Sequence, residues 1–405
     1  GADKIKINNA AEIDITPNVD FANGIDVTGA ITGTADATIN GVTVGKGANS
    51  VSNNTAIGVN ALDGAVTGQD NVAIGNGVLT QNTSGRRNTA VGSAAVDANT
   101  TGEYNTGIGY GTISTNTTGS SNTAVGHVAL LRNTTASNNT AVGESALKEN
   151  TTGATNVAVG SFALDANTTA NNNTAVGHNS LTTNTTGAEN TALGRSSMFS
   201  NTTGTNNTGL GRSALASNTT ANSNTAVGYF ALQANSTGSS NTAVGTNCLD
   251  ANTIASNNTA VGDNALGANT EGNENTAVGR SSMGDNTTGS QNTAIGRKAL
   301  QVNTTGSFNT AVGAFALDAN TTASENTAMG YGTLGSNTTG SYNTGFGRGA
   351  LRNNETANNN TAVGYLSLDA NTTGTQNVSV GAFALDANTT ANENTAVGYG
   401  SLGSN

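Results

Sequence analysis

The sequence has no tryptophan, one proline, one cysteine and only 4% aromatic residues. Charged residues are also scarce, at 10% of the 405 residues. A chain of this length would ordinarily form two or three globular domains, but few large apolar side chains are available to fill their cores. The dense charge and the proline content that mark disordered chains are missing as well. Order must therefore come from another source, and sequence repetition is the first to look for.

The charge and the lone cysteine exclude several classes of protein. A net charge of −11 and an isoelectric point near 4.5 argue against nucleic-acid binding, which needs clustered Lys and Arg. No apolar run approaches the length of a membrane-spanning helix, so we expect no membrane insertion. Cys248 has no partner for a disulfide, and we expect it to be a small core residue.

A repeat of constant length fills the chain from Asn54 onward. The Asn that opens each Asn-Thr-Ala-Val-Gly string recurs from Asn54 to Asn394 in 21 copies without an insertion or deletion. The consensus is N-T-A-V-G-x-x-A-L-x-x-N-T-T-G-x-x, numbered here as positions 1 to 17. Loops usually tolerate changes of length. A repeat that never changes length predicts a solenoid, in which each coil is tied to the coils on either side.

The predicted fold is all-β: a parallel β-solenoid or β-roll of about 21 coils, each one repeat long, over residues 54–405. We expect short strands near positions 2–4 and 7–10, and turns near positions 5–6 and 12–16. Coils stacked ~4.8 Å apart would make a rod of roughly 100 Å. Residues 1–53 are predicted to form a β-rich cap or joint, in which Val44–Ala48 is a degenerate first coil. The repeat stops at Asn405 without a polar cap, so we expect the protein to continue.

Two columns of residues are always apolar, at positions 4 and 9, and they are the predicted core. Position 5 is always Gly, which indicates a positive φ or a close backbone approach. Together with the small residue at position 3, this Gly would offer a face for close packing against other chains. Positions 6, 10, 11, 16 and 17 vary freely and should face solvent. The core residues named as representatives are Val125, Leu130, Val176, Leu181, Val227 and Leu232.

Asparagine is nearly constant at positions 1 and 12. The preferred interpretation is a pair of buried amide ladders, in which stacked side chains bond to one another and to the backbone at the corners. The alternative is N-glycosylation, because Asn-Thr-Thr is an acceptor sequence. The ladder is favoured because position 1 is equally constant without being a regular acceptor. Its representatives are Asn122, Asn133, Asn173 and Asn184.

No constellation of residues supports catalysis. His127 and His178 both occupy the variable position 6, where surface residues are expected. Aspartates recur at position 10 without consistent partners, so no acid pair for glycan cleavage is predicted. We therefore expect a protein that is not an enzyme and holds no metal or cofactor. These aspartates are Asp97, Asp165, Asp250, Asp318 and Asp386.

Aromatic residues gather at positions 6 and 7. The simpler interpretation is that these rings cover a neighbouring coil or chain. The alternative is a surface ridge that contacts carbohydrate, since aromatic rings stack on sugars and arginines bond hydroxyl groups. The candidate ridge residues are Phe162, Phe230, Phe315, Phe383 and Tyr229.

The string Asn122-Thr123-Ala124-Val125-Gly126 and its copies resemble the head repeat of trimeric autotransporter adhesins (YadA-like), whose Asn-Ser-Val-Ala-Ile-Gly motif forms a trimeric β-roll. The chain more closely resembles repeat-rich tail-fibre proteins of marine and cyanobacterial phages. In those fibres Asn-Thr-Ala-Val-Gly and Asn-Thr-Thr-Gly alternate after a lead-in like Gly41-Val42-Thr43-Val44-Gly45-Lys46-Gly47. The resemblance covers residues 41–405. It implies a trimeric fibre in a virion or outside the cell that contacts a host.

The predicted function is the structural shaft of such a fibre, which positions a receptor-binding tip for host attachment. Two apolar side chains per coil are few against the entropy of ordering a whole repeat, so partner chains are expected. The expected partners are two further copies in a homotrimer, and a host glycan or protein receptor bound through a tip outside this sequence. A bacterial trimeric surface adhesin and a self-assembling extracellular filament remain alternatives. An ice-binding solenoid is a weaker one, because the paired Thr residues at positions 13 and 14 would point opposite ways.

Overall fold

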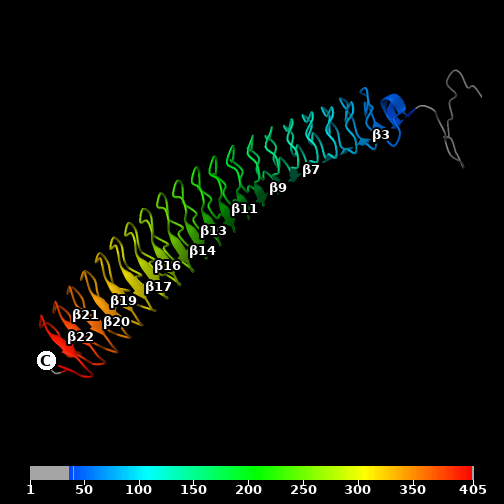
Figure 1. Cartoon of the computed structure of the whole chain (residues 1–405). Coiled ribbons are helices and arrows are strands. Elements are labelled where there is room, and N and C mark those ends of the chain that lie inside the picture. The colour runs from blue at the N-terminus through cyan, green and yellow to red at the C-terminus, as the bar shows by residue number, and fades with distance from the viewer. Residues whose placement is uncertain (1–35, 40, 404–405) are drawn as a thin grey trace, which may run out of the picture.

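The structure is a computed structural model that describes residues 36–39 and 41–403. The predicted strands before residue 36 lie outside the described residues. The chain forms a long, gently curved rod of stacked coils, with the strands along its concave side (Figure 1). The predicted parallel β-solenoid with one repeat per coil is confirmed, because every strand from β4 onward pairs in parallel with the equivalent strand of the preceding repeat.

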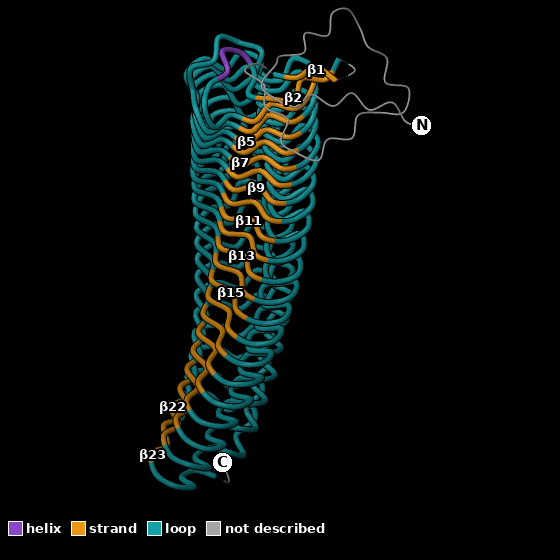
Figure 2. Tube along the Cα trace, turned by 90° about the vertical axis from the view of Figure 1, so that its right-hand side faces the viewer, coloured by secondary structure: helices purple, strands orange, loops and turns teal. Residues whose placement is uncertain are grey.

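Each coil contributes one short strand, at positions 2–4, and these strands form a single stripe along the rod (Figure 2). A three-residue helix, η1, spans Ala48–Ser50. The strands are β1 (Ala37–Ile39), β2 (Val42–Gly45), β3 (Thr55–Gly58), β4 (Val72–Ile74), β5 (Thr89–Val91), β6 (Thr106–Ile108), β7 (Thr123–Val125), β8 (Thr140–Val142), β9 (Val157–Val159), β10 (Thr174–Val176), β11 (Thr191–Leu193), β12 (Thr208–Leu210), β13 (Thr225–Val227), β14 (Thr242–Val244), β15 (Thr259–Val261), β16 (Thr276–Val278), β17 (Thr293–Ile295), β18 (Thr310–Val312), β19 (Thr327–Met329), β20 (Thr344–Phe346), β21 (Thr361–Val363), β22 (Val378–Val380) and β23 (Thr395–Val397).

An antiparallel hairpin covers the first coil. β1 pairs with β2, and β2 pairs antiparallel with β3, with Val44 opposite Ile57. The strand of the predicted degenerate coil, Val44–Ala48, therefore runs against the stack instead of continuing it, although Ala48 N still donates to Leu62 O at 2.8 Å. A reversed strand of this kind covers the edge that β3 would otherwise present for further pairing.

The predicted second strand at positions 7–10 is wrong, because this segment is a turn. Residues at positions 7 and 9 have left-handed backbone, as in Asn179 (φ 54°) and Leu181 (φ 53°). The backbone still links neighbouring coils here: Asn179 N donates to Ser161 O at 3.1 Å, and Leu181 N donates to Ser197 O at 3.0 Å. Residues with left-handed backbone turn the chain sharply, whereas extended residues would keep it straight. These turns allow one 17-residue repeat to complete a full coil.

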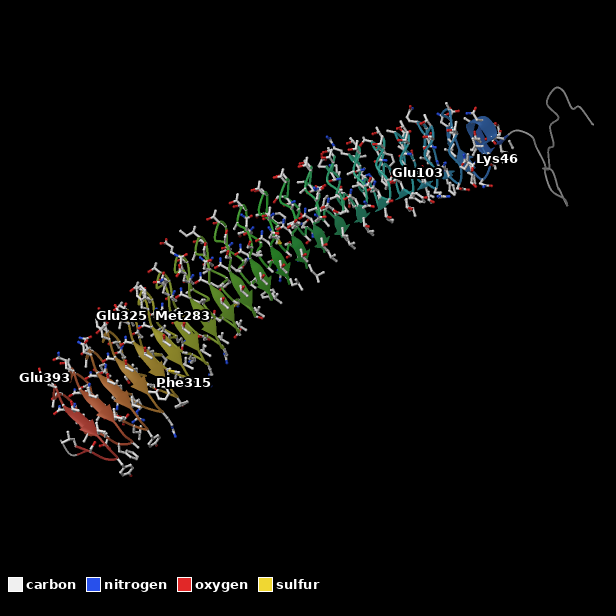
Figure 3. All side chains as sticks on the ribbon, viewed as in Figure 1. Lys46, Glu103, Met283, Phe315, Glu325 and Glu393 are labelled. Atoms are coloured by element: carbon white, nitrogen blue, oxygen red, sulfur yellow. The ribbon has the colours of Figure 1, made fainter. Side chains whose placement is uncertain are left out.

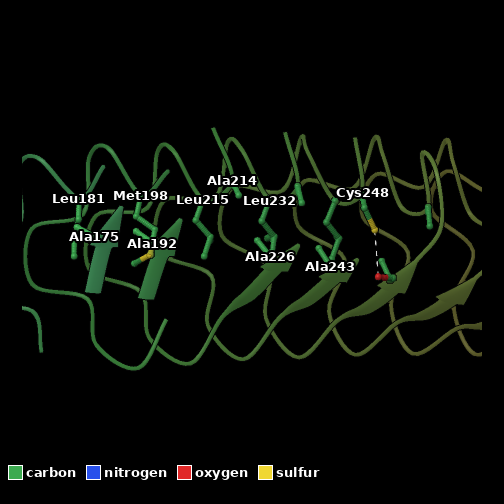
Figure 4. Close-up of a cluster of buried hydrophobic side chains, with 14 of the residues drawn as sticks. Ala175, Leu181, Ala192, Met198, Ala214, Leu215, Ala226, Leu232, Ala243 and Cys248 are labelled. Carbon is green, nitrogen blue, oxygen red and sulfur yellow. Dashed lines mark hydrogen bonds between the residues drawn. The ribbon is translucent and has the colours of Figure 1, made fainter. Parts of the chain in front are cut away.

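The interior is lined by position 9 and by the small residues at positions 3 and 8 (Figure 4). Leu181 and Ala175 are fully buried, and Leu130 and Leu232 are buried in the same way. The predicted burial of position 4 is wrong. The position-4 residues that were predicted to lie in the core are only half-buried and lie on the outer face of the sheet: Val125, Val176 and Val227. Neighbouring strand residues face opposite sides, so an inward Ala at position 3 places positions 2 and 4 outside.

The constant Gly at position 5 is explained by the stack within one chain. Gly177 has φ 132°, and a Cβ added to it would lie 2.6 Å from the carbonyl oxygen of Gly194 in the next coil. Both conditions disfavour any other residue. The predicted partner face at positions 3 and 5 is therefore wrong: position 3 points into the coil, and position 5 is closed by the neighbouring coil.

Both predicted asparagine ladders are present, and their side chains are buried except at Asn394, which is half-buried at the last described coil. At position 12, Asn184 Nδ2 donates to Asn167 Oδ1 at 3.1 Å and to Gly187 O at 2.9 Å. At position 1, the backbone N–H of Asn173 donates to Asn156 Oδ1 at 2.9 Å, and its Nδ2 donates to the same Gly187 O at 2.9 Å. Asn122 and Asn133 make the corresponding bonds and meet at the carbonyl of Ala136. Since these amides are inside, the Asn-Thr-Thr sequences of the folded rod cannot accept a glycan.

Candidate functional site

The residues that could support catalysis lie apart from one another. His127 stacks on Tyr110, with ring centroids 5.6 Å apart, and His178 lies edge-on to Phe162 at 6.3 Å. Both histidines are exposed at position 6, as predicted. Within residues 36–39 and 41–403, no group of three or more His, Cys, Asp or Glu side chains could hold a metal ion.

Cys248 fills the small interior slot at position 8. Its side chain is fully buried, and its Sγ donates to Ala260 O at 3.2 Å (Figure 4). Serines at the same position make the same bond, as Ser180 does to Ala192 O at 3.0 Å. Burial raises the pKa of the Cys248 thiol to about 12, so the thiol is neutral and unreactive at physiological pH.

The aspartates at position 10 form a half-buried row. Burial raises the pKa of the Asp165 carboxyl above its ordinary value, and the nearby Lys148 partly opposes this. Burial likewise raises the pKa of Asp250, Asp318 and Asp369. The Oδ1 atoms of Asp165 and Asp369 are buried without a hydrogen-bond partner among the described residues. These carboxyls sit against the rod wall and do not face one another across a cleft, so they do not form a glycosidase acid pair.

The outer face of the sheet is the most uniform surface of the molecule. It is made of position 2, which is Thr or Val, and position 4, which is always apolar; we call it the sheet face. Val244 and Val261 are 36% and 37% exposed, and Phe346 reaches 52%. No charged residue occurs at either position in any coil, in a chain whose net charge is −11. An uncharged surface with a continuous apolar column, as long as the rod, is typical of a contact with another macromolecule.

The predicted aromatic ridge is divided into separate clusters. Phe162 contacts only His178 among the described rings. Four coils further along, Tyr229 and Phe230 lie 3.9 Å apart, and the Arg212 guanidinium lies over both rings at 5.5 and 5.6 Å.

The third cluster is continuous. We call it the aromatic ladder: one ring or arginine from each of seven successive coils. Arg297 lies 5.1 Å from the ring of Phe315, which is edge-on to Tyr331 at 5.8 Å. At the other end, Phe383 is edge-on to Tyr365 at 5.3 Å and to Tyr399 at 5.9 Å. Between these two halves lies Arg348. The ladder consists of Arg297, Phe315, Tyr331, Arg348, Tyr365, Phe383 and Tyr399.

Phe315 projects from the strand side of the rod, and Glu325 projects from the opposite side (Figure 3). The ladder was only partly predicted, because the candidate ridge included Phe315 and Phe383 but not Tyr331, Tyr365 or Arg348. The sequence did contain a signal for this contact: Tyr331, Arg348 and Tyr365 are each one repeat apart, and residues at the same position of successive coils are neighbours.

A hollow of about 100 Å³ opens at the centre of the ladder. The rings of Tyr331 and Tyr365 and the guanidinium of Arg348 line it together with Gly349, and Gly332 leaves it open at position 7. Leu366 and Arg352 complete its rim. Position 7 is Phe315 in the coil before Gly332 and Leu366 in the coil after Gly349. Gly332 opens the hollow by omitting a side chain, whereas the Leu366 side chain fills the space beside Gly349, where an added Cβ would lie 2.6 Å from Leu366 Cδ2.

No protein-family model and no sequence among the curated proteins matches this chain. The described part of the chain also contains no helix long and apolar enough to cross a membrane.

Proposed function

We propose that this chain is the structural shaft of a fibre in a virion or outside the cell, as in a phage tail fibre, and that it holds a receptor-binding tip away from its point of attachment. The observation that carries the proposal is the unbroken stack. Every coil from β3 to β23 repeats the same pairing. A rod that varies so little along its length is suited to spanning a distance.

The residues also support a mechanical role. Inter-coil hydrogen bonds come from the strands, the turns and both asparagine columns, so each coil is held around its whole circumference. The Cys248 thiol is buried, and the two histidines lie in different coils, so neither residue type forms a nucleophile and base pair in the described part of the rod. The geometry thus favours a spacer over an enzyme.

The proposed partners are two further copies of the chain, packed through the sheet face. That face runs the length of the rod, roughly 100 Å at ~4.8 Å per coil. A partner that covers it must have the same length and the same spacing, and a second copy has both. The absence of charge at positions 2 and 4 lets two acidic chains approach there without repulsion. The number three comes from the resemblance of the Asn-Thr-Ala-Val-Gly repeat to trimeric fibres.

Light scattering on the full chain, combined with electron microscopy, tests this proposal. We expect three times the chain mass of 39.8 kDa and particles that are straight or gently bent rods. The double variant Val244→Glu and Val278→Glu should dissociate the trimer, because it places charge within the apolar contact. Ser223→Glu with Asn257→Glu, at exposed residues of position 17, is the matched control. A monomer that stays folded at all concentrations would refute the trimer, and a compact particle would refute the shaft.

Ice binding gains one supporting observation, the row of Thr at position 2 on the sheet face. Two features oppose it. The sheet face is interrupted by bulky side chains such as Phe346, and the Thr hydroxyls at position 13 are used within the stack, as Thr185 Oγ1 donates to Thr202 O at 3.1 Å. The rod is also curved (Figure 1). We expect no thermal hysteresis in a freezing assay, and clear hysteresis would replace the shaft with this function.

A further inference from the structure

The aromatic ladder differs from the rest of the surface in its chemistry. In the last seven coils, positions 6 and 7 together supply an unbroken series of rings and arginines, each in contact with the next, whereas such contacts are isolated elsewhere on the described surface. Edge-to-face rings and cation–π contacts hold side chains in fixed orientations. The ladder is therefore an ordered surface of exposed rings: Tyr331 is 55% exposed and Tyr365 is 41% exposed.

Arg348 is the polar centre of this surface. Its guanidinium lies 5.8 Å from the rings of both Tyr331 and Tyr365, two coils apart. Arg352, on the rim of the same hollow, donates to Asp369 Oδ2 at 2.8 Å. Arg348 forms no ion pair with any residue that the structure describes. Its donors, positioned by two rings, are thus available to an anion from outside.

The hollow beside Arg348 has the shape for a flat, partly apolar ligand. A Cβ added to Gly332 would meet no atom within 4 Å, so the space beside this glycine is open to solvent. The Tyr331 and Tyr365 side chains carry hydroxyl groups beside ring faces. Such amphipathic rings contact ligands that have both C–H faces and hydroxyl groups.

We propose that the aromatic ladder binds an acidic saccharide: a sugar ring bearing a carboxylate or a sulfate sits in the hollow against Tyr331 or Tyr365, and its anionic group pairs with Arg348. A nucleic acid does not fit this surface, because it needs many cations and the chain is strongly acidic. A neutral sugar would offer the Arg348 donors only hydroxyl acceptors, whereas a carboxylate or sulfate also pairs with the charge of the guanidinium. The hollow is shallow, so a single site binds weakly, and several copies along one fibre would strengthen binding through avidity.

The site is built entirely within one chain, so the proposal does not depend on the fibre function. It does require the ladder to remain accessible in the assembled protein. The competing role for these rings is structural, in which they only cover the neighbouring coils. The two roles predict different behaviour for the same substitutions.

The test uses the full chain with two probes, the tetrasaccharide of galacturonic acid and its fully methyl-esterified form. Calorimetry measures affinity, and saturation-transfer NMR shows whether aromatic protons contact the sugar ring. We expect saturable binding of the acid and at least about tenfold weaker binding of the ester, a difference of ~1.4 kcal/mol. A sulfated tetrasaccharide that binds more tightly than the uronate would assign the anion as sulfate, within the same proposal.

Variants locate the site. Arg348→Gln should weaken uronate binding about tenfold, and Tyr331→Leu should weaken it while leaving the thermal midpoint unchanged. Arg195→Gln is the matched control, because Arg195 is exposed at the same repeat position and contacts no described ring. Three results would overturn the proposal: no saturable binding, equal effects of Arg348→Gln and Arg195→Gln, or a Tyr331→Leu variant that melts earlier but binds normally.

Discussion

The two faces of one three-residue strand differ sharply in what they accept. In β10, Ala175 is fully buried, whereas Thr174 and Val176 are half-exposed. The interior column contains only Ala, Gly and one Ser, while position 4 accepts side chains from Val to Phe346. The interior of so small a coil accepts only side chains that are small enough to fit or that find hydrogen-bond partners there. Apolar character alone therefore does not identify the inside of a narrow solenoid, and the range of tolerated sizes is the better guide.

The largest expected effect tests the polar part of the interior. Asn184→Asp keeps the shape but places a carboxylate where Nδ2 now donates to two oxygens, Asn167 Oδ1 and Gly187 O. We expect a loss of about 3–5 kcal/mol in the free energy of unfolding, as for an unpaired buried charge. Urea unfolding followed by circular dichroism measures it. Asn206→Asp, at an exposed position, is the control, and equal midpoints for the two variants would contradict a buried ladder.

The next effect compares the interior with the sheet face directly. Leu181→Ala should cost about 3 kcal/mol, because it leaves a cavity in a fully buried column. Val176→Ala should cost less than about 1 kcal/mol in the isolated chain, because its side chain is already half-exposed. If copies pack through the sheet face, the loss of unfolding free energy caused by Val176→Ala grows with protein concentration. The loss caused by Leu181→Ala does not. Hydrogen exchange of the mutated coil measures both, and reversed costs would restore the original core prediction.

Two glycines with positive φ differ in whether the next coil leaves room for a side chain: Gly177 is blocked and Gly77 is not. Gly177→Ala should cost about 2–3 kcal/mol, since φ is 132° and the new methyl group meets the Gly194 carbonyl. Gly77→Ala should cost less than about 1 kcal/mol: its φ of 63° resembles that of Ala94 at the same position, and a Cβ there meets nothing within 4 Å. Thermal unfolding compares the two. Equal losses would mean that the neighbouring coil does not enforce the constant glycine.

The smallest effect concerns pH. Burial raises the pKa of the Asp165 carboxyl in the folded rod, so folding favours its protonated form. The stability that this preference contributes is fully present below the unfolded pKa and is lost as pH rises through the folded pKa. Asp165→Asn should therefore raise the thermal midpoint slightly at pH 7, and this advantage should shrink as the pH falls toward about 4. Asp285→Asn, at an exposed carboxyl, is the control. An advantage of Asp165→Asn that persists unchanged at pH 4 would contradict this account.

The fold class followed from the sequence because constant spacing constrains every position at once. The alternation of Thr, Ala and Val identified a strand and showed which residues share a face, but it did not say which face is inside. That choice depended on the space beside position 3, where residues of positions 8 and 9 lie within 3.0 Å of a Cβ added at Gly209, so Ala175 fits inside and Val176 faces outward. The absent strand at positions 7–10 could not be predicted either, because Leu181 adopts a left-handed backbone that its residue type disfavours.

The candidate site was less predictable than the fold. The recurrence of aromatic residues at positions 6 and 7 was visible, and it named Phe315 and Phe383, which are half-buried in the structure. The hollow depends on Gly332, which appears in the sequence only as ordinary variation at position 7. Its polar centre, Arg348, differs from other position-6 arginines only in having a tyrosine in the same column of both adjacent coils.

The buried asparagine amides all point the same way along the rod. Asn184 donates to Asn167, Asn201 donates to Asn184, and the position-1 column follows the same direction, always toward the N-terminal neighbour. Each finished coil thus presents open acceptors to the segment that is synthesised next. We expect assembly to be vectorial: coils are added in the order in which the ribosome makes them, each templated by its predecessor, while the reversed strand β2 blocks growth from the other end.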